Sequence, residues 1–174
     1  MSNNINKYIH YGCPIVEGTL KDDVSVNNNA YVAQHVVVKG NAYVCDDVTL
    51  EDRASVGGNA EICESASIRG DAIVDGNAVI GGHMVIGGHA HVGGDALLRG
   101  VGFIGGNAEI NSKDDVVIVQ GLTPCPLAVY KSSKWGVEVA TEGRSQSLQS
   151  FLHFGEFPQS VRGIVRDIAK KWQE

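Results

Sequence analysis

Three histidines that lie close together in the sequence, His83, His89 and His91, are the residues of this chain best suited to chemistry. Imidazole titrates near neutral pH, so it serves as a general base, and its neutral form is a common zinc ligand. We therefore take His83 and His91 as candidate catalytic residues. Whether they can act depends on the elements that carry them.

Those elements repeat with a period of six residues. From Leu20 to Ile110 every sixth residue is a branched aliphatic, and two positions before each, from Val26 onward, lies a second core residue, most often alanine. Side chains two apart share one face of a strand, so each hexad predicts a short strand with one large and one small core residue. The residue between them points to solvent.

The other half of each hexad carries turn residues, as in Gly58-Asn59, Gly70-Asp71 and Gly82-His83. Glycine, asparagine and aspartate tolerate positive φ best, so the chain can bend every six residues without strain. This pattern places His83 and His89 at turn corners and His91 on the outer face of a strand.

Repeats such as Gly-Asn-Ala-Val-Ile-Gly-Gly-His, from Gly76 to His83, resemble the bacterial hexapeptide-transferase family over Leu20 to Ile110. The resemblance implies a mainly β fold, a left-handed parallel β-helix with three hexads per coil and so about five coils, followed by a small C-terminal α/β capping module. In repeat style the chain is most similar to uncharacterised phage and prophage hexapeptide proteins. The family is typically trimeric, with ligand sites between protomers.

Two kinds of enzyme in that superfamily use histidines, and the resemblance points to both. Acyltransferases use one histidine as a general base, whereas the related carbonic anhydrases bind zinc through three. The spacing of His83, His89 and His91 differs from the zinc-binding pattern, so we expect no metal there. Among the histidines, His91 would stack on Glu109 and is either an oriented base or a solvated surface pair.

With three hexads per coil, residues eighteen apart stack at about 4.8 Å, the spacing of neighbouring strands. Arg53, Asp71 and His89 share one corner column and form either a surface charge ladder or part of a polar ligand site. Cys45 and Cys63 also stack, and we expect them to be outward-facing free thiols, close enough for a disulfide in an oxidising compartment. A third column is expected to be a structural ladder of turn residues: Asp23, Asn41, Asn59, Asn77 and Asp95.

Several outward strand positions are apolar, although a lone solenoid should present polar residues there: Ile73, Val79, Val85, Leu97 and Phe103. Either neighbouring subunits or the C-terminal segment should cover them. The resulting clefts would be lined by Phe103, His83 and His91, and the candidate ligand-binding residues are His89, Arg53, Asp71, Val85 and Phe103.

The period ends after Ile110, which predicts three segments: an N-terminal cap (1–19), the repeat solenoid (20–112) and a C-terminal module (113–174). In the module we expect strands at 116–120, 127–130 and 136–140, then a helix capped by Ser147 and a second helix after Ser160. The second helix should bury one face: Val161, Ile164, Val165, Ile168 and Trp172. Both end segments should cap the raw edges of the solenoid.

Composition narrows the function classes. A net charge of −6 and a pI near 5.5 argue against a nucleic-acid-binding protein. The first residues lack the basic and apolar stretches of a secretory signal, and no run is long enough to span a membrane, so we expect a cytoplasmic location.

Two functions remain open at this level. The first is a non-catalytic homo-oligomeric binder or scaffold that needs no cofactor. Such a protein could be phage-encoded and would sequester a small molecule or block a host protein. The second is an acyltransferase that uses acetyl-CoA and a histidine base, as the family resemblance implies.

Overall fold

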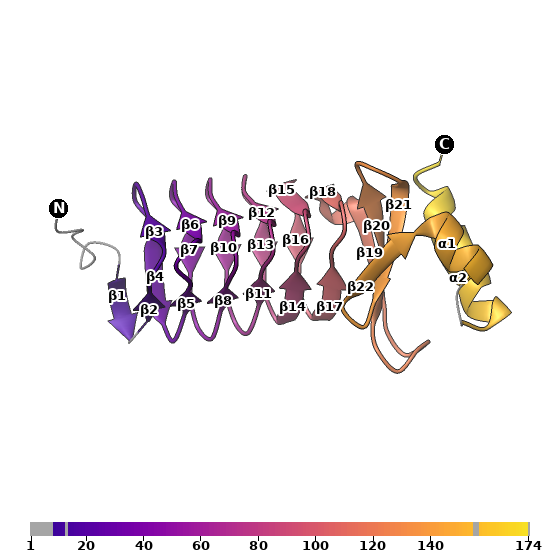
Figure 1. The fold of residues 1–174 in the computed structure, drawn as a ribbon, viewed down its shortest axis with the longest axis horizontal. Coiled ribbons are helices and arrows are strands. Elements are labelled where there is room, and N and C mark those ends of the chain that lie inside the picture. The colour runs from indigo at the N-terminus through magenta and orange to yellow at the C-terminus, as the bar shows by residue number, and fades with distance from the viewer. Residues whose placement is uncertain (1–8, 13, 155–156, 174) are drawn as a thin grey trace.

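The protein is a parallel β-solenoid of about five coils that ends in a small antiparallel sheet and two helices (Figure 1). The structure, a computed structural model, describes residues 9–12, 14–154 and 157–173. The predicted mainly β, coiled architecture is confirmed. Residues Ile9–Gly12 and Gln159–Lys170 lie toward opposite ends of the long axis (Figure 1).

Three six-stranded parallel sheets form the walls of the solenoid. Sheet A contains β1 (Ile9–Gly12), β4 (Ser25–Asn28), β7 (Tyr43–Val44), β10 (Glu61–Ile62), β13 (Val79–Ile80) and β16 (Leu97–Leu98). Sheet B contains β2 (Ile15–Val16), β5 (Tyr31–Val32), β8 (Thr49–Leu50), β11 (Ser67–Ile68), β14 (His83–Ile86) and β17 (Val101–Ile104). Sheet C contains β3 (Thr19–Leu20), β6 (Val37–Val38), β9 (Ser55–Val56), β12 (Ile73–Val74), β15 (His91–Asp95) and β18 (Glu109–Ser112).

The register joins residues eighteen apart in sequence, as the three-hexad coil requires. Ile62 pairs with Ile80, and Ile80 pairs with Leu98. Strand pairing begins before Leu20, because β1 and β2 already pair with β4 and β5. The sixfold pattern is interrupted in this first part of the chain, so the sequence did not show it.

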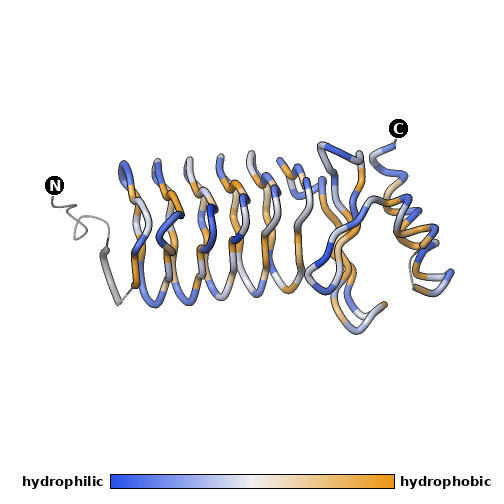
Figure 2. Tube along the Cα trace, in the orientation of Figure 1, coloured by the Kyte–Doolittle hydropathy of each residue, from blue (hydrophilic) through white to orange (hydrophobic). Residues whose placement is uncertain are grey.

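The interior of the coils is a continuous apolar stack. Every sixth residue from Val26 to Ile110 is buried, and the alanines two positions earlier fill the space between them. Figure 2 shows the resulting alternation of hydrophobic and hydrophilic stretches along each coil. Each fully buried large aliphatic side chain contributes about 1.5–3 kcal/mol of transfer free energy, which explains why the repeat tolerates so few exceptions.

The corners are built from residues with positive φ. Gly58 has a φ of 62°, and a Cβ there would lie only 2.6 Å from the carbonyl oxygen of Gly76 in the next coil. The predicted ladder of turn residues is present, with Asn41 bonded to Asn59, Asn59 to Asn77 and Asn77 to Asp95, at 3.0, 3.0 and 2.9 Å.

The C-terminal module closes one end of the solenoid (Figure 1). Its antiparallel sheet D has the order β19 (Val116–Val119), β20 (Leu127–Ser132), β21 (Gly136–Thr141) and β22 (Arg144–Ser147). A short 3₁₀ turn, η2 (Lys113–Asp115), connects it to β18. The solenoid core continues into this sheet through Ala128, Tyr130 and Ala140, so the module completes the core at this end.

Two helices cover the outer side of sheet D, α1 (Leu148–Phe154) and α2 (Gln159–Lys170). As predicted, the Ser147 hydroxyl caps α1 by accepting a hydrogen bond from the Ser150 N–H at 3.1 Å. Helix α2 begins at Gln159, two residues earlier than predicted, and has no side-chain cap. Val161 and Val165 are buried, but Ile164, expected on the same face, is 39% exposed because it lies at the edge of the apolar stripe.

Candidate functional site

The best oriented candidate base is His91, on the outer face of sheet C. Its Nε2 lies 3.0 Å from Asp75 Oδ1, and both side chains are half-exposed. The predicted neighbour, Glu109, is the Cα partner of His91, but the hydrogen-bonding partner is Asp75, because the ring reaches back over the corner that follows β12. A carboxylate on one ring nitrogen orients the ring as a general base requires.

Gly93 keeps this pair accessible. A Cβ on Gly93 would lie 2.5 Å from Asp75 Oδ1 and 3.1 Å from His91 Nε2, so a larger residue would displace the pair. The third nearest atom to that Cβ position is Asn111 Oδ1, at 3.4 Å. The His91–Asp75 pair could accept a proton, but it lines neither of the hollows described below.

His83 lies elsewhere. It is the first residue of β14 in sheet B and is exposed, whereas His91 lies in sheet C. Phe103 is in sheet B, where its Cα partner is Val85 and the Arg69 guanidinium lies 5.9 Å from its ring centroid. Thus the structure brings Val85 and Phe103 together but places the two candidate catalytic histidines on different walls of one chain.

Arg53, Asp71 and His89 form the column expected at one corner. Arg53 donates two hydrogen bonds to Asp71, at 2.6 and 2.9 Å, and His89 Nδ1 lies 3.5 Å from the same carboxylate. The hydrogen bond from Arg53 holds the pKa of Asp71 below its usual range, and the Asp71 carboxylate raises the pKa of Arg53. Because the charges pair within the column, the geometry fits a surface ladder better than a ligand site.

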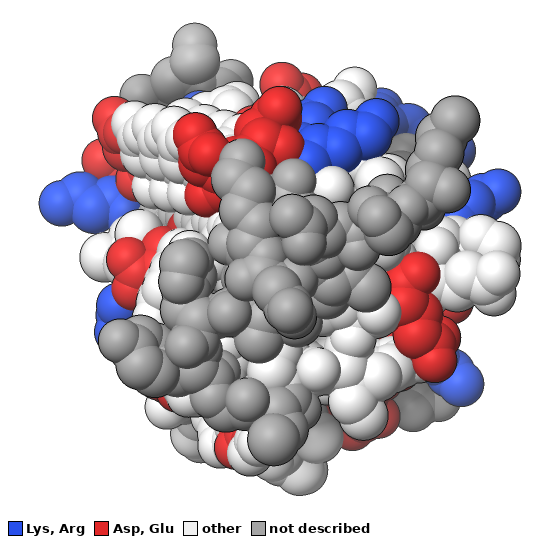
Figure 3. Space-filling view, turned by 90° about the vertical axis from the view of Figure 1, so that its left-hand side faces the viewer, with Lys and Arg blue, Asp and Glu red and all other residues white. Residues whose placement is uncertain are grey.

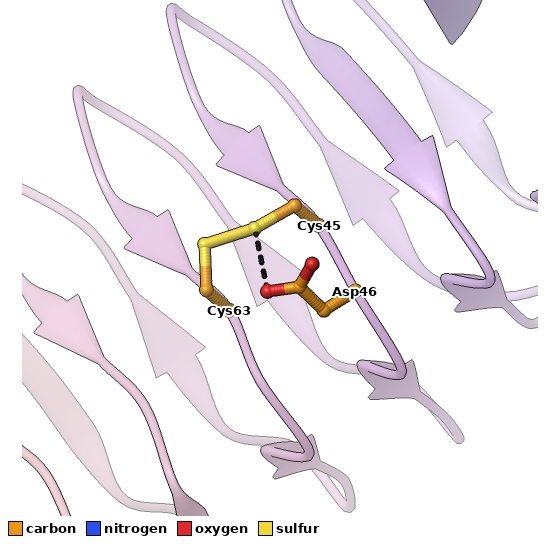
Figure 4. A group of neighbouring side chains, drawn as sticks. All are labelled: Cys45, Asp46 and Cys63. Atoms are coloured by element: carbon orange, nitrogen blue, oxygen red, sulfur yellow. Dashed lines mark hydrogen bonds between the residues drawn. A yellow bond between two sulfur atoms is a disulfide. The ribbon is translucent and has the colours of Figure 1, made fainter. Parts of the chain in front are cut away.

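Cys45 and Cys63 differ from the expectation of free thiols. They are joined by a disulfide between adjacent coils (Figure 4), and Cys45 is only 5% exposed rather than outward-facing. Cys45 and Cys63 each follow a buried aliphatic residue, Val44 and Ile62, so their side chains lie next to each other at the same corner of adjacent coils. Asp46, next to Cys45, points toward the two sulfur atoms.

Sequence reasoning missed a polar hollow of about 290 Å³ between the last coil and the cap. Asp115 and Lys131 form an ion pair at its wall, with Nζ and Oδ1 2.5 Å apart, and Trp172 contributes an aromatic edge. A second hollow, of about 350 Å³, lies between the β21–β22 turn and Phe154. The sixfold pattern points to neither, because the first hollow combines residues from Glu109 to Trp172, far apart in the chain, and the second lies outside the repeat, between Thr141 and Phe157.

The surface seen from the N-terminal end carries charges of both signs. Viewed from the N-terminal end, acidic and basic side chains both lie around the rim, and the basic ones form no broad continuous patch on this side (Figure 3). Neither helix in the described part of the chain is long and apolar enough to cross a membrane.

Comparison with known proteins gives no relative: no protein-family model, no curated protein and no solved structure matches this chain. The class of protein, a capped parallel β-solenoid, therefore rests on the coordinates themselves.

Proposed function

We propose that this chain is a non-catalytic binding or scaffold protein that works as a homo-oligomer. The observation that carries the proposal is a row of apolar side chains on the outer face of sheet A. Tyr43, Val79 and Leu97 stack there in one register column, interrupted only by Glu61. Tyr43 and Leu97 are 41% and 49% exposed.

This row is not needed to fold a single chain. The opposite face of each strand already fills the core, and the C-terminal module packs on the end of the solenoid rather than over Leu97. Of the two covers considered for the apolar positions, the chain's own tail therefore does not serve Leu97 or Ile73. A second copy packed on sheet A would cover Leu97 and its column, and burying one such side chain contributes about 1.5–3 kcal/mol.

One further feature supports a binding role over catalysis. His83 and His91 lie on different sheets, so they do not form one catalytic pair within a single chain. A small molecule or a partner protein would then be held between copies, in the arrangement typical of hexapeptide trimers that the repeat resembles.

Native mass spectrometry of the gently purified protein tests the proposal, because it reports subunit number and retained small molecules together. We expect a trimer for the natural sequence and a monomer for Leu97→Asp, since a carboxylate in the row is incompatible with burial. Ile73→Asp is the matched control: it is an aliphatic residue of similar exposure, 45%, on sheet C, and should leave the trimer intact. A monomeric natural protein would refute the proposal.

An acyltransferase is the second candidate, and the oriented His91–Asp75 pair is the observation in its favour. If it holds, the protein binds acetyl-CoA, and His91→Ala abolishes acetyl transfer while His83→Ala retains it, because only His91 has an orienting carboxylate. Failure to take up acetyl-CoA, or unchanged transfer by His91→Ala, would exclude it.

A further inference from the structure

The corner between sheets A and B carries a group of soft and hard donor atoms that the proposed binding role does not use. Cys45 and Cys63 directly follow β7 and β10, so their backbones are held one coil apart, with a Cα–Cα distance of 4.8 Å. The sulfur atoms and a carboxylate oxygen of Asp46 all lie within 4.8 Å of one another.

The carboxylate of Asp46 is held in place by the solenoid. One oxygen accepts a hydrogen bond from the Glu64 N–H at 3.1 Å, and the other accepts one from the Asn28 amide at 2.8 Å. The first of these oxygens lies 3.4 Å from Cys45 Sγ (Figure 4). A carboxylate oxygen fixed this close to the sulfur would let a cation contact both once the disulfide is reduced.

Glu61 supplies a fourth donor. Its Oε1 lies 3.9 Å from Cys63 Sγ, and its side chain is exposed, so it can adjust. The next residue of the cysteine column is Gly81, which has no side chain to cover Cys63 from the following coil. Cys63 is half-buried and can be reached from solvent, whereas Cys45 is shielded.

We propose that the reduced pair Cys45 and Cys63, together with Asp46 and Glu61, binds a thiophilic divalent cation such as Zn²⁺, and that the disulfide is the metal-free state of the same site. Zinc prefers four tetrahedral ligands, with sulfur at about 2.3 Å and carboxylate oxygen at about 2.0–2.2 Å. These bond lengths require the two sulfur atoms to lie about 3.8 Å apart. Side chains stacked on neighbouring coils reach that separation by rotation about Cα–Cβ alone.

The two states interconvert by thiol–disulfide exchange. A low-molecular-weight disulfide oxidises the metal-bound dithiolate: the two cysteine sulfurs lose two electrons and form the S–S bond, and the cation leaves as an aquo ion. The oxidant takes up those electrons and two protons and is released as two thiols. Oxidation therefore releases the cation, and an excess of the same thiol reverses each step.

Cobalt(II) is the probe that tests this site, because thiolate coordination gives a near-ultraviolet charge-transfer band and tetrahedral geometry gives strong visible bands. The full-length protein is reduced with a phosphine, its free thiols are counted, and Co²⁺ is titrated with and without competing Zn²⁺. We expect one equivalent per chain, displaced by Zn²⁺, and complete loss of the bands after oxidation with a small disulfide.

Three variants identify the donors. Cys63→Ser should abolish the charge-transfer band, whereas Cys125→Ser, at a half-buried cysteine that is not part of the disulfide, should leave it unchanged. Asp46→Asn should weaken Co²⁺ affinity at least tenfold, since even the loss of an outer-shell partner weakens metal affinity about 10–100-fold. A reduced natural protein that binds no Co²⁺, or bands that survive Cys63→Ser, would show that the pair is a structural disulfide only. The comparison of oxidised and reduced natural protein keeps the test decisive if a variant fails to fold.

Discussion

Single inward residues in this chain are constrained by their counterparts one coil above and one coil below. Ile80 pairs with Ile62 and Leu98 and is almost completely buried. A substitution at Ile80 therefore disturbs the packing of three coils. The outward Ile73, in contrast, is 45% exposed in the single chain.

Ile80→Asp should unfold the solenoid, because it places an unpaired carboxylate in the core. We expect a loss of more than about 4 kcal/mol in the free energy of unfolding, the range of the most severe core substitutions. Urea unfolding followed by circular dichroism measures it. Ile73→Asp, the same chemical change on the outer face, is the control, and similar losses in both variants would contradict the assignment of faces.

Asp115 gives the cap a dependence on pH. Burial alone would raise the pKa of this carboxyl, but hydrogen bonds from Lys131, the Asn111 N–H and Ser112 prevail and lower it. Because the pKa is lower in the folded than in the unfolded protein, the stabilisation is fully present above the unfolded value of about 3.9. It is lost as the pH falls through the folded value.

Lys131→Met should therefore lower the stability at neutral pH by about 1 kcal/mol, a modest value because the lysine is half-exposed. The difference from the natural protein should begin to shrink as the pH falls below about 4, and it should disappear once the pH is below the lowered folded pKa and Asp115 is protonated in both proteins. Urea titrations across this pH range check the trend. Lys170→Met, which breaks the exposed Lys170–Asp167 pair, should change stability little at any pH; a difference for Lys131→Met that persists in acid would refute the linkage.

At the scale of elements, the joint between the last coil and sheet D depends on buried polar contacts. The Tyr130 hydroxyl accepts from the Gly105 N–H and donates to the Gly105 carbonyl oxygen, both at 3.2 Å. Burial raises the pKa of Tyr130, so its hydroxyl keeps its proton and can donate. Glu138, also buried, accepts hydrogen bonds from the Ser132 hydroxyl at 2.8 Å and from the Asn107 N–H at 3.3 Å.

Gly106→Ala should break this joint. Gly106 has a φ of 58°, and a Cβ there would collide with the Glu138 carboxylate, which is held by its own hydrogen bonds. The matched control is Gly136→Ala: Gly136 has a φ of 72°, but no atom lies within 4 Å of its Cβ position. The control isolates the backbone penalty of about 1–2 kcal/mol.

Hydrogen exchange measures the result, and amides of β20 and β21 should lose protection in Gly106→Ala well before they do in Gly136→Ala. Equal protection in the two variants would show that the joint tolerates the collision.

Elements of the cap were predictable where they carry an apolar pattern and not elsewhere. Strands β19, β20 and β21 appeared close to their predicted bounds because each contains a run of branched or aromatic residues. Strand β22, Arg144–Ser147, is polar, and only its antiparallel pairing with β21 makes it a strand. Its backbone hydrogen bonds come from a neighbour, which a local pattern does not show.

At the scale of the whole molecule, the solenoid is an array in which each coil contacts mainly its neighbours, and the cap terminates it. The core runs on into sheet D, where Val116 and Ile118 pack against it. Without this module the last coil would present bare strand edges and an open apolar core.

A chain truncated after Ser112 should therefore associate end to end, since unpaired parallel strands of one copy can pair with those of another. Electron microscopy of the truncated chain should show filaments or elongated multimers that retain the β-type circular dichroism of the full chain. A truncated chain that stays folded with the subunit number of the full-length protein would contradict a capping role.

The sequence by itself determined the six-residue unit: the sixfold alternation of large aliphatic and small residues predicts short strands that bury every large side chain, and the resemblance to hexapeptide repeats added the eighteen-residue register. It also placed Arg53, Asp71 and His89 in one column, because stacking converts a fixed spacing into contact.

Only the tertiary structure decided that His91 pairs with Asp75, that Cys45 and Cys63 are bonded beside Asp46, and that Glu138 anchors the cap. These contacts depend on side-chain direction at corners and on packing between segments outside the repeat. Neither is encoded in a local period.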